Sequence, residues 1–324
     1  MHEIYDVWPQ ISKDSYSADF QQIDFQGINH IVFAGMGGSG SLHDVFSAVL
    51  SKTDIHTSIV KGYHLPNTVD SETLVVATSV SGDTVETMTV LDLAAKSNCK
   101  LIAFSSGGKM KDYCIKMKID YREIPMYHSP RASFTSFLFA ILKILKNVIP
   151  IKREDIFESI HNLEKLQRKI SSENLDNINP AVELASWITD FPVIYYPWGL
   201  QAAAIRFKNS LQENAKMHVI SEDMIEASHN GIVAWSRKSP FKPILIRGHD
   251  DYIKTKERWD IIKEYFEKNE IEYREVFSIK GSILSKLINL IYLLDYATVY
   301  KAVMSEIDPT PVEPINFMKS RVSY

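Results

Sequence analysis

Short apolar runs alternate with stretches of helical spacing along most of the chain, from about residue 28 onward. In the first half, strands are expected at 31–34, 56–60, 74–78, 100–104 and 120–124, and the run at 74–77 has the length and β-branching of a buried parallel strand. Helical patterns occupy 41–51, 84–96, 107–117 and 131–148. Strands that alternate with helices over short connections predict a parallel sheet with helices on both faces.

The same alternation begins again in the second half of the chain. An amphipathic stretch at 151–176, with apolar residues at helical spacing, comes first and reads as a connector. Helices are then expected at 181–189, 199–212, 252–268 and 282–304, and strands at 191–196, 218–221, 243–247 and 273–277. We therefore predict an α/β protein with two βαβ domains, 1–150 and 177–324, joined by the connector 151–176.

The segment LVVATSVSGDTVET, residues 74–87, carries the strongest functional signal. A buried strand runs directly into four hydroxyl side chains around Gly82, and a helix follows. The hydroxyls belong to Thr78, Ser79, Ser81 and Thr84. One capping hydroxyl would explain a helix start, whereas four exceed that need. The pattern favours a site for a phosphate or phosphosugar, built from hydroxyls, backbone N–H groups and the helix dipole.

A second turn, GMGGSG at 35–40, follows the first strand, and a helix is expected to begin near Ser41. Its glycines allow the main chain to approach a ligand closely. A dinucleotide site is the alternative, but it requires an acidic residue at the end of the second strand. Asp54 lies before that strand, and no Gly-Lys-Ser/Thr follows to make a Walker A loop. The turn is therefore better explained as part of the phosphate site.

The composition limits the kinds of binding partner and the cellular compartment that we expect for this protein. The 324 residues carry 36 basic and 40 acidic side chains, and a net charge of −4 disfavours nucleic acid as a partner. The two cysteines are too few for a disulfide framework, and the histidines lack metal-ligand spacing, so we expect no metal site. The N-terminus does not resemble a signal peptide, and we expect no membrane-spanning segment. These observations predict a soluble cytoplasmic protein.

Two residues in the second half are candidates for proton transfer. Glu213 stands at the C-terminal end of an expected helix, where the dipole disfavours a negative charge, and such a carboxylate can serve as a general base. His229 lies between a polar loop and an apolar run, a position that can place an imidazole in a cleft. A solvated surface glutamate and a structural histidine would fit the same patterns.

Six motifs occur here in one order, from about residue 30 to Lys319. They are GMGGSG, SVSGDTVET, SPRASF, QENAK, ASHNGIVAW and DPTPVEPI. This series resembles the archaeal-type bifunctional phosphoglucose/phosphomannose isomerases, which are built from two sugar isomerase (SIS) domains. The resemblance implies an enzyme that interconverts glucose 6-phosphate and mannose 6-phosphate with fructose 6-phosphate through a cis-enediolate. It also implies a homodimer with shared active sites and a reaction that needs neither a cofactor nor a metal.

The resemblance further implies a role for each motif residue. Arg131 would stabilise the enediolate, Glu213 would move the proton between C1 and C2, and His229 would help to open the sugar ring. In relatives this histidine comes from the neighbouring subunit, and Lys319 would match a ring-opening lysine. The residues implied to line the sugar-phosphate site are Gly37, Gly38 and Ser39, and those implied to hold the phosphate are Ser79, Ser81 and Thr84.

The sequence departs from the family pattern at two places. Val80 and Asp83 stand where relatives commonly have Tyr and Asn, and Asp83 puts a carboxylate beside the expected phosphate unless it points outward or caps a helix. Ser-Leu-His-Asp follows GMGGSG where relatives have small apolar residues. Two other functions stay open at this point. One is a non-catalytic sugar-phosphate-binding regulator, and the other is an aminosugar-phosphate isomerase or deaminase.

Overall fold

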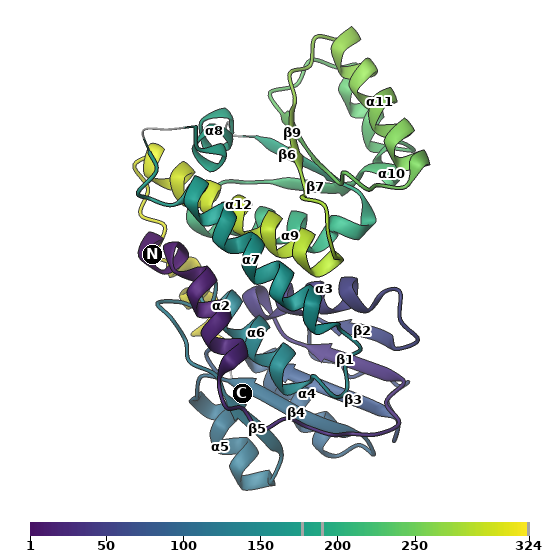
Figure 1. The fold of residues 1–324 in the computed structure, drawn as a ribbon, viewed down its shortest axis with the longest axis vertical. Helices are drawn as coiled ribbons and strands as arrows, with labels where there is room; N and C mark the ends of the chain where they lie inside the picture. The colour runs from purple at the N-terminus through teal and green to yellow at the C-terminus, as the bar shows by residue number, and fades with distance from the viewer. Residues whose placement is uncertain (176–177, 189–190, 323–324) are drawn as a thin grey trace. The chain divides into compact units, whose positions relative to one another are not determined.

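The computed structural model describes residues 1–175, 178–188 and 191–322, which form two compact units (Figure 1). Unit 1 comprises Met1, Glu3–Glu154 and Val312–Tyr324, and unit 2 comprises His2 and Asp155–Pro311. Most of the expected connector, 155–176, therefore belongs to unit 2, whereas the C-terminal segment is grouped with unit 1. Each unit holds one parallel sheet flanked by helices, as the alternating pattern predicts.

The sheet of unit 1 has five parallel strands in the order β2-β1-β3-β4-β5. They are β1 (His30–Ala34), β2 (His56–Val60), β3 (Thr73–Thr78), β4 (Lys100–Ser105) and β5 (Asp120–Glu123). β1 and β3 are fully buried, because apolar residues cover both faces of each strand. The strand order reverses between β1 and β3, and ligands of such sheets bind at the carboxyl ends of the strands at this point.

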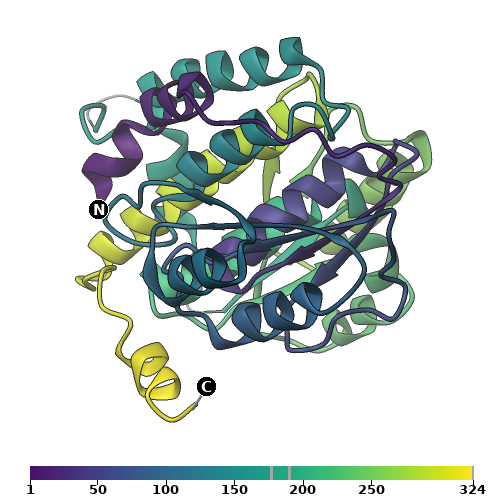
Figure 2. The same cartoon turned by 90° about the horizontal axis from the view of Figure 1, so that it is seen from below.

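Helices cover both faces of this sheet (Figure 2). The helices of unit 1 are α1 (His2–Asp6), α2 (Trp8–Ser17), α3 (Gly37–Leu50), α4 (Val85–Ala95), α5 (Gly108–Met117), α6 (Phe134–Ile144) and α13 (Glu313–Lys319). α3 contacts α6 on one face, whereas α4 and α5 pack on β3, β4 and β5 on the other. The expected helix start near Ser41 was wrong: α3 begins at Gly37, so the glycine-rich turn is the first turn of the helix.

Unit 2 has four parallel strands in the order β7-β6-β8-β9. These are β6 (Pro192–Tyr196), β7 (Ile220–Asp223), β8 (Lys242–Arg247) and β9 (Arg274–Phe277). Its helices are α7 (Arg153–Ile170), α8 (Pro180–Trp187), α9 (Gln201–Asn214), α10 (Met224–Ala227), α11 (Ile253–Lys268) and α12 (Ile283–Met304), with 3₁₀ turns η1 (Trp198–Leu200) and η2 (Gly231–Ser236). α12 contacts α8 and α9, and these three helices form one side of the core of the unit. Thr189, expected to end a helix, lies outside the described residues.

Among the described residues, helix α12 is long and apolar enough to cross a membrane by length and composition alone, which the sequence did not lead us to expect. However, 78% of its most apolar window is buried inside the protein. It carries Asp295 at 0% exposure within an ion pair to α9. α12 is therefore packed as the core helix of unit 2.

Candidate active site

The hydroxyl-rich loop after β3 is held in shape by its own side chains. The Ser79 hydroxyl donates to Thr84 Oγ1 at 2.9 Å and accepts the Gly82 N–H at 3.1 Å. Thr84 directly precedes α4 but makes no side-chain bond to the first N–H groups of that helix. Those N–H groups stay oriented toward the loop and supply the positive end of the helix dipole to an anion.

Close packing on the next βα loop fixes the conformation at Gly82 and Asp83. Gly82 has φ +79°, and a Cβ at this position would lie 1.9 Å from the carbonyl oxygen of Gly107. Only glycine fits such a contact. The Asp83 carboxylate is exposed and accepts the Lys109 N–H at 3.1 Å, at the start of α5. Asp83 therefore caps α5, which explains how a carboxylate is tolerated beside an anion site.

The glycine-rich turn meets this loop at the point where the strand order reverses. Because α3 begins at Gly37, the N–H groups of Gly37, Gly38 and Ser39 belong to its first turn, where a helix has no internal acceptors for them. The Ser39 hydroxyl accepts the Val80 N–H at 3.3 Å, so the two loops touch. The structure thus brings both predicted phosphate segments together.

The loop that carries Arg131 completes this group. A Cβ added at Gly38 would lie 3.5 Å from the carbonyl oxygen of Pro130, and Arg131 is only 7% exposed. The Ser133 hydroxyl accepts the Tyr127 N–H at 2.8 Å and lies 2.8 Å from the carbonyl oxygen of Ser129. The loop around Arg131 is therefore folded on its own hydrogen bonds.

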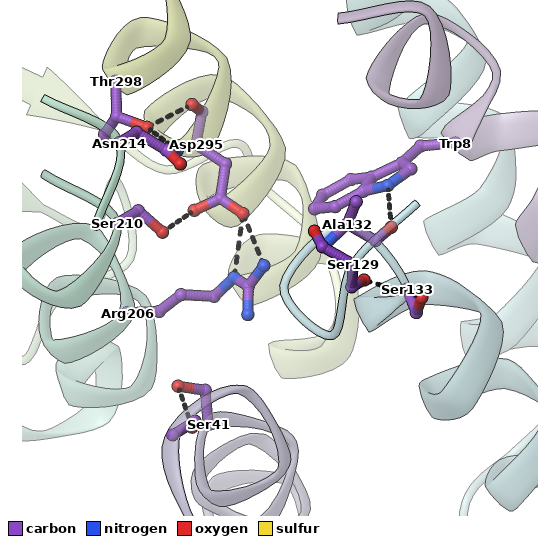
Figure 3. A network of polar contacts seen from close by, with 11 residues as sticks. Trp8, Ser41, Ser129, Ala132, Ser133, Arg206, Ser210, Asn214, Asp295 and Thr298 are labelled. Atoms are coloured by element: carbon purple, nitrogen blue, oxygen red, sulfur yellow. Dashed lines mark hydrogen bonds and ion pairs between the residues drawn. The ribbon is translucent and has the colours of Figure 1, made fainter. Parts of the chain in front are cut away.

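Trp8, which was not predicted from the sequence, also supports the Arg131 loop. Its Nε1–H donates to the Ala132 carbonyl at 2.8 Å, as Figure 3 shows, and the indole is fully buried. The ring lies 6.1 Å from that of Phe134. The signal in the sequence was the three-residue spacing of Tyr5, Trp8 and Ile11, which places these side chains on one helical face.

His43 lies directly behind the phosphate loops. Its Nε2 is 3.0 Å from the Thr78 hydroxyl, and Thr78 directly precedes Ser79. Burial, with a smaller effect of Lys61, lowers the pKa of His43 to about 3, so the imidazole is neutral at physiological pH. Lys61 pairs with Asp44 at 2.6 Å. The unusual His-Asp sequence after GMGGSG thus builds support beneath the loops.

The two expected proton-transfer residues lie in unit 2. Glu213 is in the last turn of α9 and is partly exposed. His229 lies between α10 and η2 with an exposed side chain, and its backbone N–H donates to the Glu226 carbonyl at 2.9 Å. Lys319 is the last residue of α13 and is exposed. Within the described residues, no group of three or more potential metal ligands gathers.

Comparison with known proteins identifies the family. A bifunctional phosphoglucose/phosphomannose isomerase from Caldicellulosiruptor bescii is 32% identical over 313 residues, which cover 92% of this chain and 91% of the relative. The chain belongs to this family of isomerases. A bifunctional phosphoglucose/phosphomannose isomerase from Thermoplasma acidophilum is 29% identical over 93% of this chain and 94% of its own. The family indicated by the six motifs is thereby confirmed.

Two further matches concern the C-terminal half and the fold of this family member. Residues 177–322 match the bacterial phospho-glucose isomerase C-terminal SIS domain. The C-terminal domain of a glucosamine-fructose-6-phosphate aminotransferase from Francisella tularensis superposes with a TM-score of 0.71, over 94% of this chain and 96% of its own. At 15% identity, this structural likeness concerns the fold, and it confirms the predicted α/β class.

Proposed function

We propose that this protein interconverts glucose 6-phosphate and mannose 6-phosphate with fructose 6-phosphate. The observation that carries this proposal is the 32% identity, over nearly the whole chain, to a bifunctional phosphoglucose/phosphomannose isomerase. Glu213 and His229 supply groups for acid–base catalysis. A non-catalytic regulator that only binds a sugar phosphate does not need such groups. Both cysteines are free thiols, which suits the reducing cytoplasm, where we place this activity.

The phosphate of the sugar is assigned to the loops of unit 1. The first turns of α3 and α4 offer N–H groups, and Ser81 and Thr84 offer hydroxyls around them. Such donors suit a dianionic phosphate, and the binding energy of this remote group positions the reacting carbons. Ser79, which was expected to hold the phosphate, instead holds the loop through its bonds to Thr84 and Gly82.

The proton transfer is assigned to Glu213. Its carboxylate takes the C2 proton of the open-chain aldose, and the electron pair of the C–H bond forms the C1=C2 double bond of a cis-enediolate. When the same proton returns to C1, the hydroxyl proton on O2 passes to O1 and C2 becomes a carbonyl, which gives fructose 6-phosphate and restores the carboxylate. The permanent charge of Arg131 stabilises the oxyanion that develops. His229 and Lys319 are assigned to ring opening, which requires a proton at the ring oxygen.

Replacement of Glu213 by Gln tests this assignment. The variant keeps the size of the side chain but removes the proton acceptor, so kcat should fall by at least about 10⁴-fold while the binding of 6-phosphogluconate stays near the wild-type level. Glu264→Gln, at an exposed position of α11, is the matched control and should be fully active. Exchange of the C2 proton with deuterium at the wild-type rate in Glu213→Gln would show that another group is the base.

The phosphate loop has a separate test. Ser81→Ala with Thr84→Ala should raise KM for fructose 6-phosphate, because each lost hydrogen bond to a charged group costs about 1.5–3 kcal/mol. An unchanged KM would place the phosphate elsewhere. Release of ammonia from glucosamine 6-phosphate, without isomerisation of fructose 6-phosphate, would identify an aminosugar-phosphate enzyme instead.

We also propose that the enzyme is a homodimer with shared active sites, as the resemblance of its motifs to the family implies. Inactive Glu213→Gln and His229→Ala protomers should be mixed under conditions that exchange subunits. If one pocket takes the two residues from different chains, heterodimers regain one intact site of two. Absence of recovery, after subunit exchange has been verified by mass spectrometry, would show that each pocket takes both residues from the same chain.

A further inference from the structure

The motif QENAK contributes more than Glu213, because the residues after it anchor the end of α9. Asn214 is fully buried, and its Nδ2 donates to Thr298 Oγ1 at 2.7 Å. The Thr298 hydroxyl in turn donates to the Asp295 carbonyl at 2.7 Å. The last turn of α9 is therefore fastened to α12 directly beside Glu213.

The two preceding turns of α9 are fastened to the same part of α12. The Asp295 carboxylate accepts from the Arg206 guanidinium at 2.6 and 2.9 Å, and from the Ser210 hydroxyl at 2.7 Å (Figure 3). Arg206, Ser210 and Asn214 stand four positions apart and so share one face of the helix. Movement of the buried face of α9 would leave these charged and polar groups without partners, which is costly in the interior.

Lys216 fastens the other side of Glu213. Its Nζ donates to the Glu213 carbonyl at 2.6 Å, to the Pro311 carbonyl at 2.7 Å and to the Pro309 carbonyl at 3.4 Å. Its backbone has φ +56°, a left-handed conformation that a non-glycine residue adopts only at a cost. The conformation returns the side chain to the helix end, where a cation also meets the negative end of the dipole.

We propose that Lys216 is a positioning residue for Glu213. It closes the last turn of α9 onto the segment 309–311, while Asn214 fastens the same turn to α12, so the main chain of Glu213 is held from two directions. This inference rests on the proposed function of Glu213 as the base. A base must lie within hydrogen-bonding reach of the proton that it moves, and a displacement of about 1 Å can cost about 10²-fold in rate.

Lys216→Met is the decisive variant, because Lys216 is exposed and its loss leaves the core intact. We expect kcat for fructose 6-phosphate to fall about 10–100-fold, with KM changed less than about threefold. C2 proton exchange should slow by the same factor as kcat. Lys216→Arg keeps a cationic donor that can reach the carbonyls, and it should recover most of kcat.

Lys268→Met is the matched control. Lys268 is also an exposed lysine at the C-terminal end of a helix in unit 2, so this variant removes the same charge from the same kind of position. It should retain wild-type kcat. Thermal melting and titration with 6-phosphogluconate report the fold and the sugar-phosphate site independently of proton transfer, and both should be unchanged in Lys216→Met.

Three results would overturn the inference. A kcat in Lys216→Met equal to that of Lys268→Met would show that the bonds of Lys216 to the main-chain carbonyls do not position Glu213 for proton transfer. A rise in KM alone would place Lys216 on the substrate. A parallel loss of kcat, melting temperature and 6-phosphogluconate binding would give it a structural role only. An inactive wild-type enzyme would instead refute the proposed function, before any variant is compared.

Discussion

Lowering the pH from 7 to 5 should destabilise unit 1 by about 2 kcal/mol through His43 alone. In the unfolded chain this histidine titrates near the ordinary histidine pKa of 6.5, whereas burial lowers its pKa in the folded protein to about 3. At pH values between these two pKa values, the unfolded state binds a proton at His43 and the folded state does not, so stability falls as the pH falls. Each pH unit below the unfolded-state pKa lowers the free energy of unfolding by about 1.4 kcal/mol. Since pH 5 lies one and a half units below 6.5, the loss is about 2 kcal/mol.

Urea unfolding of the wild type and of His43→Gln, at pH 7 and pH 5, measures this contribution. Glutamine can place a polar atom near the Thr78 hydroxyl but does not titrate. Pulse proteolysis with mapped fragments follows unit 1 separately from unit 2. With an m-value of about 2 kcal/mol/M, the wild-type midpoint should drop by about 1 M more than that of the variant.

Because the wild type and His43→Gln are compared, the contributions of the other titratable groups near this site to the pH dependence of stability cancel. Burial raises the pKa of Asp44, and this acts in the opposite direction, since the folded state then binds a proton more readily than the unfolded state. Burial likewise lowers the pKa of His30. Both groups are present in both proteins. An equal loss of stability in wild type and variant would refute the neutral, buried state of His43.

Three further outcomes are expected. Gly82→Ala should destabilise unit 1 by more than about 1 kcal/mol and raise KM, because Gly82 has a positive φ and the added Cβ would clash with the Gly107 carbonyl. Urea unfolding measures the stability and steady-state kinetics measure KM. A variant with unchanged stability and KM would contradict the packing described here. Arg206→Leu should cost about 3–5 kcal/mol, because the buried Asp295 carboxylate loses its cationic partner, whereas the double variant with Asp295→Leu should cost less; equal losses in urea unfolding would contradict this. Burial raises the pKa of Cys114 to about 12, so iodoacetamide at pH 8 should label it only after unfolding, as mass spectrometry would show.

The central strands could be predicted because apolar runs specify buried strands, whereas the polar edge strands β5 and β7 were expected from the alternation of strands and helices. In unit 1 every strand lies within one residue of its expected range, and in unit 2 β7 is shifted by two. Helix α2, of ten residues, and the short helices α1, α10 and α13 were not predicted. Helices of four to seven residues depend on tertiary contacts more than on their own pattern. The start of α3 was misread because glycine favours turns, although here packing overrides propensity.

Candidate site residues could be predicted only where their chemistry is local in sequence. Ser79, Ser81 and Thr84 lie within six positions and together indicate an anion site. Trp8 acts on a carbonyl 124 positions away, and Lys216 on carbonyls more than 90 positions away. No sequence spacing reveals such contacts, because the fold alone brings the partners together.

The capping of α5 by Asp83 has a consequence for the thermodynamics of ligand capture. The loop after β3 is already fixed by Asp83, by the Gly107 contact and by the internal bonds of Ser79. A phosphate that arrives there has little chain to immobilise, so little conformational entropy is lost on association. Affinity at this loop should therefore depend mainly on how well donors replace the hydration of the anion, and inorganic phosphate should bind without a large ordering penalty.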